Sequence, residues 1–240
     1  MGESFGAWRM GSDEALMDYV SSVNIACGFH GGDASVIRKT VETAISKGVK
    51  IGAHPSYPDL QGFGRREMKM SAAEIFDLVL YQVSAVKGVC EAFGGRLNHV
   101  KPHGALYNTA AKDAKIAAAI AAAVKKTGKD LIFYGLSGSF LISEAERIGL
   151  RSASEVFADR TYQSDGSLTP RTAPNALIDD SKQAIAQVLE MILEQKVTAA
   201  DGQKVTLKAD TICIHGDGRH ALEFASLINA ELSRCGIIIG

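Results

Sequence analysis

Short apolar runs rich in β-branched residues alternate along the chain with longer stretches whose apolar positions recur every three or four residues. The short runs predict strands and the longer stretches predict amphipathic helices. The expected strands are 23–28, 49–54, 97–103, 131–136, 152–158 and 211–215, and the expected helices are 33–47, 71–93, 112–126, 139–148, 180–195 and 219–233. Such alternation predicts an α/β fold in which helices cover a parallel sheet.

The longest expected helix carries both a start signal and a clear apolar face. Ser71 and Glu74 have the spacing of a capping box, and Asp33 and Asp180 are expected N-caps of two other helices. The apolar stripe of the longest helix consists of Ile75, Leu78, Val79, Val83, Val86 and Cys90. Near the C-terminal end, Asp201-Gly202 between two runs rich in Val and Thr predicts a small β-hairpin.

Composition narrows the class of protein. The chain has 240 residues, a length common for single α/β barrels, and no linker or charge block divides it, so one domain over residues 1–240 is expected. A net charge of -1 gives no reason to expect a nucleic acid or a membrane surface as partner. The four cysteines form no C-x-x-C pair and the first residues lack an apolar signal segment, which predicts buried or half-buried thiols in a cytoplasmic protein.

Four of the six histidines stand at the ends of expected strands. His30, His54, His103 and His215 are each followed directly by Gly or Pro. In a parallel barrel the carboxyl ends of all strands meet on one rim, where catalytic side chains gather. A single such histidine is more often a satisfied loop residue, but the joint pattern favours an active site.

Strand alternation selects which side chains share the inner face of this sheet. Successive side chains point to opposite faces, so the apolar positions assign the others to the interior. The inward polar set is Asn24, His54, Lys101, His103, Glu155 and His215. Because a buried charge is rarely unpaired, Lys101 is expected to meet an acid such as Glu155. The alternative is that Lys101 extends along an edge toward water.

A metal site stays open at this point. His99 and His103 would lie roughly 13 Å apart on one strand, at about 3.3 Å per residue, too far to share an ion unless the strand ends before Pro102. A site built from His30, His54, His103 or His215 with an acid such as Asp33 or Asp217 remains an alternative. The chain carries neither a G-x-S-x-G elbow nor a G-x-x-x-x-G-K-[ST] phosphate loop, so it shows no ATP motif of its own.

Seven motifs in order along the whole chain resemble the LamB/YcsF family. They are GESFG (2–6), NIACGFHGGD (24–33), GAHPSYPD (52–59), GFGRR (62–66), HVKPHGALY (99–107), EVFADR (155–160) and CIHGD (213–217). The resemblance implies an irregular, seven-stranded (β/α) barrel similar to the glycoside hydrolase/deacetylase superfamily. It also implies ATP-dependent hydrolysis of the lactam of 5-oxo-L-proline to L-glutamate, in a 5-oxoprolinase complex with subunits B and C, where ATP is bound with or by those partners.

The resemblance also places polar motif positions on named residues. The expected catalytic residues are His54, Lys101, His103, Glu155 and His215, and the expected substrate-binding residues are Asn24, His30, Asp33, Asp159, Arg160 and Asp217. Within these sets, Glu155 or His54 would be the general base, and Lys101 with His103 or His215 would stabilise a developing oxyanion. Asn24 and Arg160 would orient the substrate carboxylate.

The start of the chain departs from the family pattern. Members carry a strand of the form D-x-N-x-D-L before the GESFG motif, whereas Met1 directly precedes Gly2 in this chain. The first strand of the barrel is therefore expected to be missing. Two other functions stay open: a metal-dependent amide or polysaccharide deacetylase, and a non-catalytic scaffold subunit of a carboxyltransferase-like complex.

Overall fold

A computed structural model describes residues 1–218 and 220–240, and the chain forms two compact units. Unit 1 comprises residues 1–135 and 139–152, and unit 2 comprises residues 136–138 and 153–240. Arg219, the first residue of the last expected helix, lies outside the described residues. The expectation of a single domain stays a prediction.

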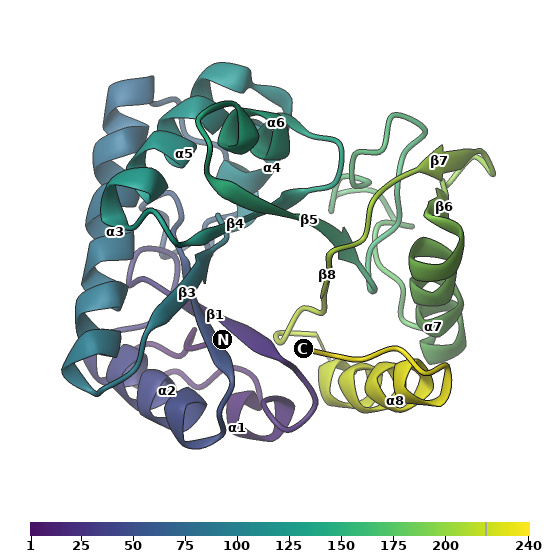
Figure 1. The fold of residues 1–240 in the computed structure, drawn as a ribbon, viewed down its shortest axis with the longest axis horizontal. Helices are drawn as coiled ribbons and strands as arrows, with labels where there is room; N and C mark the ends of the chain where they lie inside the picture. Colours follow the sequence, from purple (N-terminus) through teal and green to yellow (C-terminus); the bar gives the residue numbers. More distant parts are fainter. Residues whose placement is uncertain (219) are drawn as a thin grey trace. The chain divides into compact units, whose positions relative to one another are not determined.

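Parallel strands form the centre of unit 1 (Figure 1). Their order is β1 (Ser22–Ala26), β2 (Lys50–His54), β3 (Leu97–Val100) and β4 (Ile132–Leu136). Asn24 is in register with Gly52, which in turn is in register with His99, and Ala26 is in register with His54. The strand alternation expected for Asn24 and His54 is thereby confirmed, because residues in register or two apart share a face.

Helices cover the outer side of these strands (Figure 1). They are α1 (Asp13–Leu16), α2 (Ala34–Ser46), α3 (Ala72–Ala92), α4 (Gly104–Lys112), α5 (Ala114–Thr127) and α6 (Phe140–Arg147). The capping box at the start of α3 is confirmed, and the expected stripe of α3 is buried except for Leu78, which is half-buried. Within the described residues, no helix combines the length and apolar character needed to cross a membrane.

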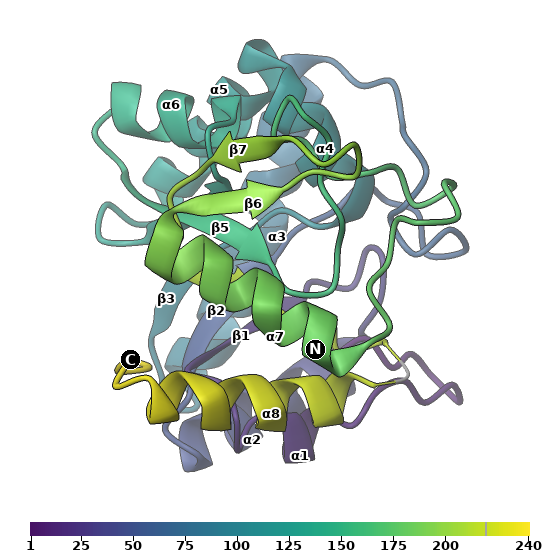
Figure 2. The same cartoon turned by 90° about the vertical axis from the view of Figure 1, so that its right-hand side faces the viewer.

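Unit 2 combines a parallel strand pair with two helices and a hairpin (Figure 2). Strand β5 (Arg151–Phe157) pairs with β8 (Thr211–Cys213), and α7 (Ser181–Leu189) lies beside α8 (Ala221–Arg234). The expected hairpin is confirmed as β6 (Lys196–Thr198) paired antiparallel with β7 (Lys204–Thr206). The expected helix 180–195 changes to a π-helix over Glu190–Glu194 and ends at Gln195, which has a left-handed φ of 53°.

The segment around Pro102 differs from the expected strand 97–103. Strand β3 ends at Val100, and His103 takes the N-cap position of α4, a helix that the periodicity did not predict. Proline has no N–H for a sheet ladder, and Gly104 has a φ of 57°, so the chain turns here from strand to helix. A second difference concerns Cys235, which is exposed, whereas Cys27 and Cys90 are buried as expected.

The segment before β1 pairs with the sheet. The amino group of Met1 donates to the carbonyl of Asn24 at 2.8 Å, and the amide of Ala26 donates to the carbonyl of Met1 at 3.0 Å. The carbonyl of Asn24 and the amide of Ala26 therefore have backbone partners at this edge of the sheet. This pairing brings the following residues of the GESFG motif up to the strand ends of unit 1.

Candidate functional site

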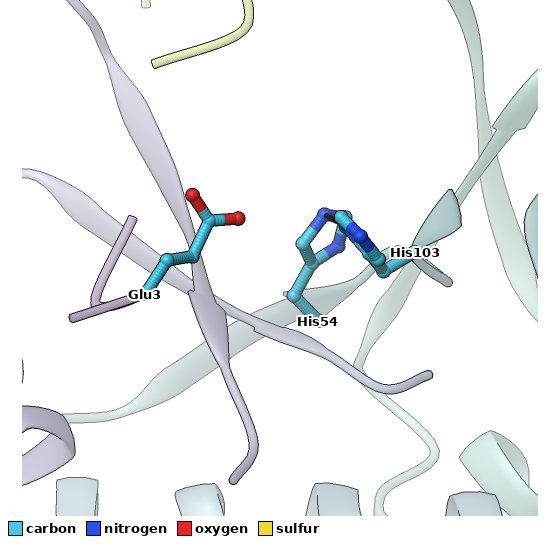
Figure 3. Close-up of side chains that lie close together, drawn as sticks. All are labelled: Glu3, His54 and His103. Atoms are coloured by element: carbon cyan, nitrogen blue, oxygen red, sulfur yellow. Dashed lines mark hydrogen bonds between the residues drawn. The ribbon is translucent and has the colours of Figure 1, made fainter. Parts of the chain in front are cut away.

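Three buried histidines and one glutamate gather at the carboxyl ends of the strands of unit 1. His54 ends β2, His103 caps α4, and His30 precedes α2, while Glu3 comes from the segment before β1. The rings of His30 and His103 stack with centroids 3.7 Å apart, and Nδ1 of His103 lies 3.0 Å from Nε2 of His54. Figure 3 shows the Glu3 carboxyl group and the rings of His54 and His103 turned toward a common space. We call these four residues the histidine cluster.

Backbone carbonyls fix the orientation of two of these rings. Nδ1 of His54 lies 2.6 Å from the carbonyl oxygen of Lys101, and Nε2 of His103 lies 2.8 Å from that of Phe63. A carbonyl oxygen can only accept, so each of these nitrogen atoms donates an N–H. In the neutral rings, the opposite nitrogen atoms therefore carry lone pairs and face each other.

Burial and mutual charge keep the rings neutral beside an ionised acid. Burial lowers the pKa of His54 and His103 well below the ordinary 6.5, and the neighbouring histidines, which would repel a second positive charge, lower it further. Burial likewise lowers the pKa of His30. Burial alone would raise the pKa of Glu3, but the N-terminal ammonium group and His30 hold it well below its ordinary value. The cluster therefore offers neutral imidazole nitrogen atoms and a carboxylate near neutral pH.

The loop after β2 closes over the cluster and is held by specific contacts. The Gln82 side chain on α3 accepts from the Ser56 amide at 2.9 Å and donates to the Ser56 carbonyl at 2.8 Å. Phe63 has a φ of 55° and Gly64 a φ of 64°, and this turn aims the Phe63 carbonyl at His103. A Cβ on Gly64 would lie 2.2 Å from Ser56 Oγ and 2.9 Å from His103. Glycine is thus required where the backbone approaches the cluster.

A second polar layer lies deeper between the strands of unit 1. Nε2 of His99 lies 3.0 Å from Oδ1 of Asn24, and the His99 ring stacks on Tyr134 with centroids 4.1 Å apart. Gly52 leaves room for this ring, since a Cβ there would lie 2.1 Å from His99 Nε2. Burial, with Lys101 and Lys50, lowers the pKa of His99 to about 3. The Asn24 amide, expected to bind substrate, here orients a neutral His99.

Lys101 and Glu155 are both buried, as strand alternation requires of the inward set. The Lys101 ammonium group lies 5.7 Å from the centroid of the Tyr107 ring. Lys101 belongs to unit 1 and Glu155 to unit 2, and their expected pairing stays a prediction. The Lys101 backbone also serves the histidine cluster, because its carbonyl orients His54.

Two of the expected site residues, His215 and Asp159, are paired within unit 2. Asp159 accepts from Nδ1 of His215 at 2.9 Å and from its backbone amide at 3.1 Å. Burial would raise the pKa of Asp159, but the His215 ring and these hydrogen bonds lower it to about 2. The buried Arg160 donates through Nε to the carbonyl of Ala176 and through Nη2 to that of Thr169.

Two further expected substrate-binding residues lie elsewhere. Asp33 caps α2, accepting from the amides of Ser35 and Val36, and its other carboxyl oxygen accepts from the Gly6 amide at 2.9 Å. Asp217 is an exposed residue of unit 2. The structure thus brings His30, His54 and His103 together, and it commits Asp33 to a helix terminus. Binding of substrate by Asp33 and Asp217 stays a prediction.

Glu3 is the site residue that strand alternation missed. Within the described residues, one group of acids, histidines or cysteines offers ligand atoms close enough for an ion: Glu3, His54 and His103, with ligand atoms within 4.8 Å of one another. Glu3 lies in no periodic element, and the only signal for it is its place in the GESFG motif.

Replacing Asp159 with asparagine is expected to remove stability that depends on pH. A carboxyl pKa lowered from 3.8 to about 2 stabilises the fold above pH 4, by about 2 kcal/mol, and this contribution is lost as the pH falls toward 2. Urea unfolding should show the wild type more stable than Asp159→Asn at pH 7, with the difference shrinking near pH 2.5. An equal difference at both pH values would contradict the pairing with His215.

Comparison with known proteins covers the whole chain. The sequence profile of the LamB/YcsF family matches residues 1–240. The chain is 60% identical over 239 residues to a Bordetella pertussis protein named as the A subunit of 5-oxoprolinase, covering 100% of this chain and 95% of that protein. The chain is also similar to the crystal structure of a "Lactam Utilization Protein" from Thermus thermophilus. The two sequences are 44% identical, the TM-score is 0.93, and the match covers 100% of this chain and 96% of that one.

A more distant solved structure bears on the fold alone. It is an Enterococcus faecalis V583 protein, 13% identical, with a TM-score of 0.52 and coverage of 95% of this chain and 89% of that one. The two nearer matches and the family profile span all seven motifs, from GESFG to CIHGD, and with them every residue of the histidine cluster. The chain therefore belongs to the LamB/YcsF family.

Proposed function

We propose that the chain is the A subunit of an ATP-dependent 5-oxoprolinase, which hydrolyses the lactam of 5-oxo-L-proline to L-glutamate as ATP is hydrolysed. The observation that carries the proposal is the 60% identity, over the full chain, to a protein named for this role. The strand ends supply the groups that such chemistry requires: neutral imidazoles, a buried lysine and buried acids.

The proposal assigns roles to the strand-end residues. A five-membered lactam is a resonance-stabilised amide, so its carbonyl must be activated before water can attack. Phosphorylation of the lactam oxygen, with ATP bound with or by the partner subunits, would supply that activation. Glu155 or His54 would take a proton from the attacking water, and Lys101, with His103 or His215, would stabilise the negative charge on oxygen. Asn24 and Arg160 would orient the substrate carboxylate.

Partners, location and the wider fold belong to the same proposal. Subunits B and C of 5-oxoprolinase are the proposed partners, because the name of the B. pertussis relative designates one subunit of several. A cytoplasmic location agrees with a substrate and a nucleotide that are small metabolites. The parallel strands and the likeness to the E. faecalis structure support an irregular barrel of the glycoside hydrolase/deacetylase type.

Omission of each subunit in turn tests this function. With 5-oxo-L-proline and ATP, a mixture of this chain with subunits B and C should form glutamate, and the mixture without this chain should form none. The mixture without this chain should also lose the ATP hydrolysis that depends on 5-oxoproline. Glutamate formation by B and C alone, at the full rate, would contradict the proposal and leave the chain in an accessory role.

A further inference from the structure

Two imidazole lone pairs face each other across a buried gap in unit 1. Because the Lys101 carbonyl takes the N–H of His54 Nδ1, the lone pair of His54 lies on Nε2. The Phe63 carbonyl likewise takes the N–H of His103 Nε2, so the lone pair of His103 lies on Nδ1. These two atoms are 3.0 Å apart, and two lone pairs at that distance repel unless a cation lies against both.

A third buried histidine beside this gap, His30, is not satisfied by hydrogen bonds. His30 is 1% exposed and stacks on His103, yet neither of its ring nitrogen atoms has a hydrogen-bond partner among the residues that the structure describes. Its Nε2 lies 3.6 Å from Oε1 of Glu3. Buried polar groups are normally satisfied, so an unsatisfied histidine beside two opposed lone pairs indicates that a charged ligand completes the cluster.

We propose that Glu3, His54 and His103 bind one divalent transition-metal ion of the zinc class. Their ligand atoms lie within 4.8 Å of one another. Ligands at about 2.1 Å from an ion in tetrahedral geometry would lie roughly 3.4 Å apart. A small movement of the Glu3 side chain therefore completes the set, with His30 beside it to hold the carboxylate.

The donor atoms select the class of ion. Two imidazole nitrogen atoms with one carboxylate suit zinc, cobalt or nickel, whereas magnesium and calcium prefer oxygen ligands throughout. Three protein ligands are typical of catalytic zinc sites, which leave a further position open to water or substrate. The backbone carbonyls of Lys101 and Phe63 orient the two rings as outer hydrogen-bond partners of metal-bound histidines do. At this site the ion would polarise a bound oxygen atom, and because His54 would be a ligand of the ion, Glu155 would remain as the proposed proton acceptor.

Metal content measured on the full chain tests the site without any turnover. The purified chain is stripped with a chelator and equilibrated with zinc chloride, and bound zinc is then counted by elemental analysis. The wild type should bind one ion per chain. His54→Gln, His103→Gln and Glu3→Gln should each weaken binding by at least about 10–100-fold, the loss usual even for outer partners of metal ligands.

Cobalt chloride gives a second measurement and His220→Gln a matched control. Cobalt bound by imidazole nitrogen and carboxylate oxygen should show visible absorption bands in the wild type that are lost in the three variants. His220 is an exposed histidine near Glu223, and its replacement should change neither zinc binding nor the bands. Thermal unfolding checks that each variant is folded, and Glu3→Gln alters the least buried of the three ligands.

Two outcomes would overturn the metal site. One is the absence of a saturable zinc site in the folded wild type, with histidine nitrogen NMR showing a proton shared between His54 and His103. The other is equal zinc binding by the wild type and all three variants, which would place the ion elsewhere. Either outcome leaves the proposed 5-oxoprolinase function standing, because zinc binding is measured in the absence of substrate and partner subunits.

Discussion

Replacing Lys101 with methionine is expected to lower kcat for glutamate formation by about 10²–10³-fold, the usual loss when one group that stabilises an oxyanion is removed. Methionine retains most of the length and the apolar stem of lysine but lacks the ammonium group that lies over the Tyr107 ring. The backbone carbonyl of residue 101 remains available to orient His54. The substitution therefore removes the ammonium group together with its contacts and keeps the backbone of residue 101.

Stability should respond to this change as well as activity. Removing one partner of a buried ion pair typically destabilises a protein by about 3–5 kcal/mol, because the other charge is left uncompensated. If Lys101 pairs with Glu155 as expected, the free energy of unfolding in urea should fall by about this amount, so kcat is measured under conditions in which the variant is shown to be folded. A kcat within about twofold of the wild type would contradict the role of Lys101, since the loss expected from one such group is far larger.

Replacing Gly52 with alanine is expected to destabilise unit 1 by about 2–4 kcal/mol, through overpacking and a strained buried hydrogen bond. The added Cβ would lie 2.1 Å from His99 Nε2. The His99 ring is fully buried, stacks on Tyr134 and is hydrogen-bonded to Asn24, so it has no free space to enter. Urea unfolding monitored by circular dichroism measures the loss.

Gly88→Ala is the matched control for this prediction. Gly88 lies inside α3, and a Cβ there would meet no atom of residues 1–218 and 220–240 within 4 Å. Alanine at this position should stabilise the chain by about 0.5–1 kcal/mol, because glycine costs that much in a helix interior. If Gly52→Ala were as stable as Gly88→Ala, the close approach of Gly52 to His99 would be wrong.

Alternation along the strands was enough to predict which side chains of the candidate site share one face of the sheet. The apolar residues Val23 and Ile25 assigned Asn24 to the inner face, and the register of Asn24 with Gly52 confirms it. The N-cap at Asp33 could be predicted from local sequence alone, because an aspartate directly before an amphipathic run commonly caps the helix that follows. Features with a fixed repeat or a fixed local motif can thus be predicted from the residues themselves.

The remaining site features depend on contacts between distant segments. Glu3 reaches the histidine cluster because Met1 pairs with β1, and no periodic pattern announces such a contact. Phe63 has a left-handed backbone that is rare outside glycine, so its carbonyl contact with His103 follows from the packing of the loop. His103 itself was expected on a strand, but Pro102 and the positive φ of Gly104 place it at a helix start.

The proposed role of His54 in opening the lactam is tested most directly by the kcat of the complex containing His54→Gln. Its matched control is the complex containing His220→Gln, measured with the same subunits B and C. We expect a loss of at least about 10²-fold for His54→Gln, the lower end for loss of an acid–base group, and an unchanged rate for His220→Gln. Equal rates in the two complexes, with both chains folded, would contradict it.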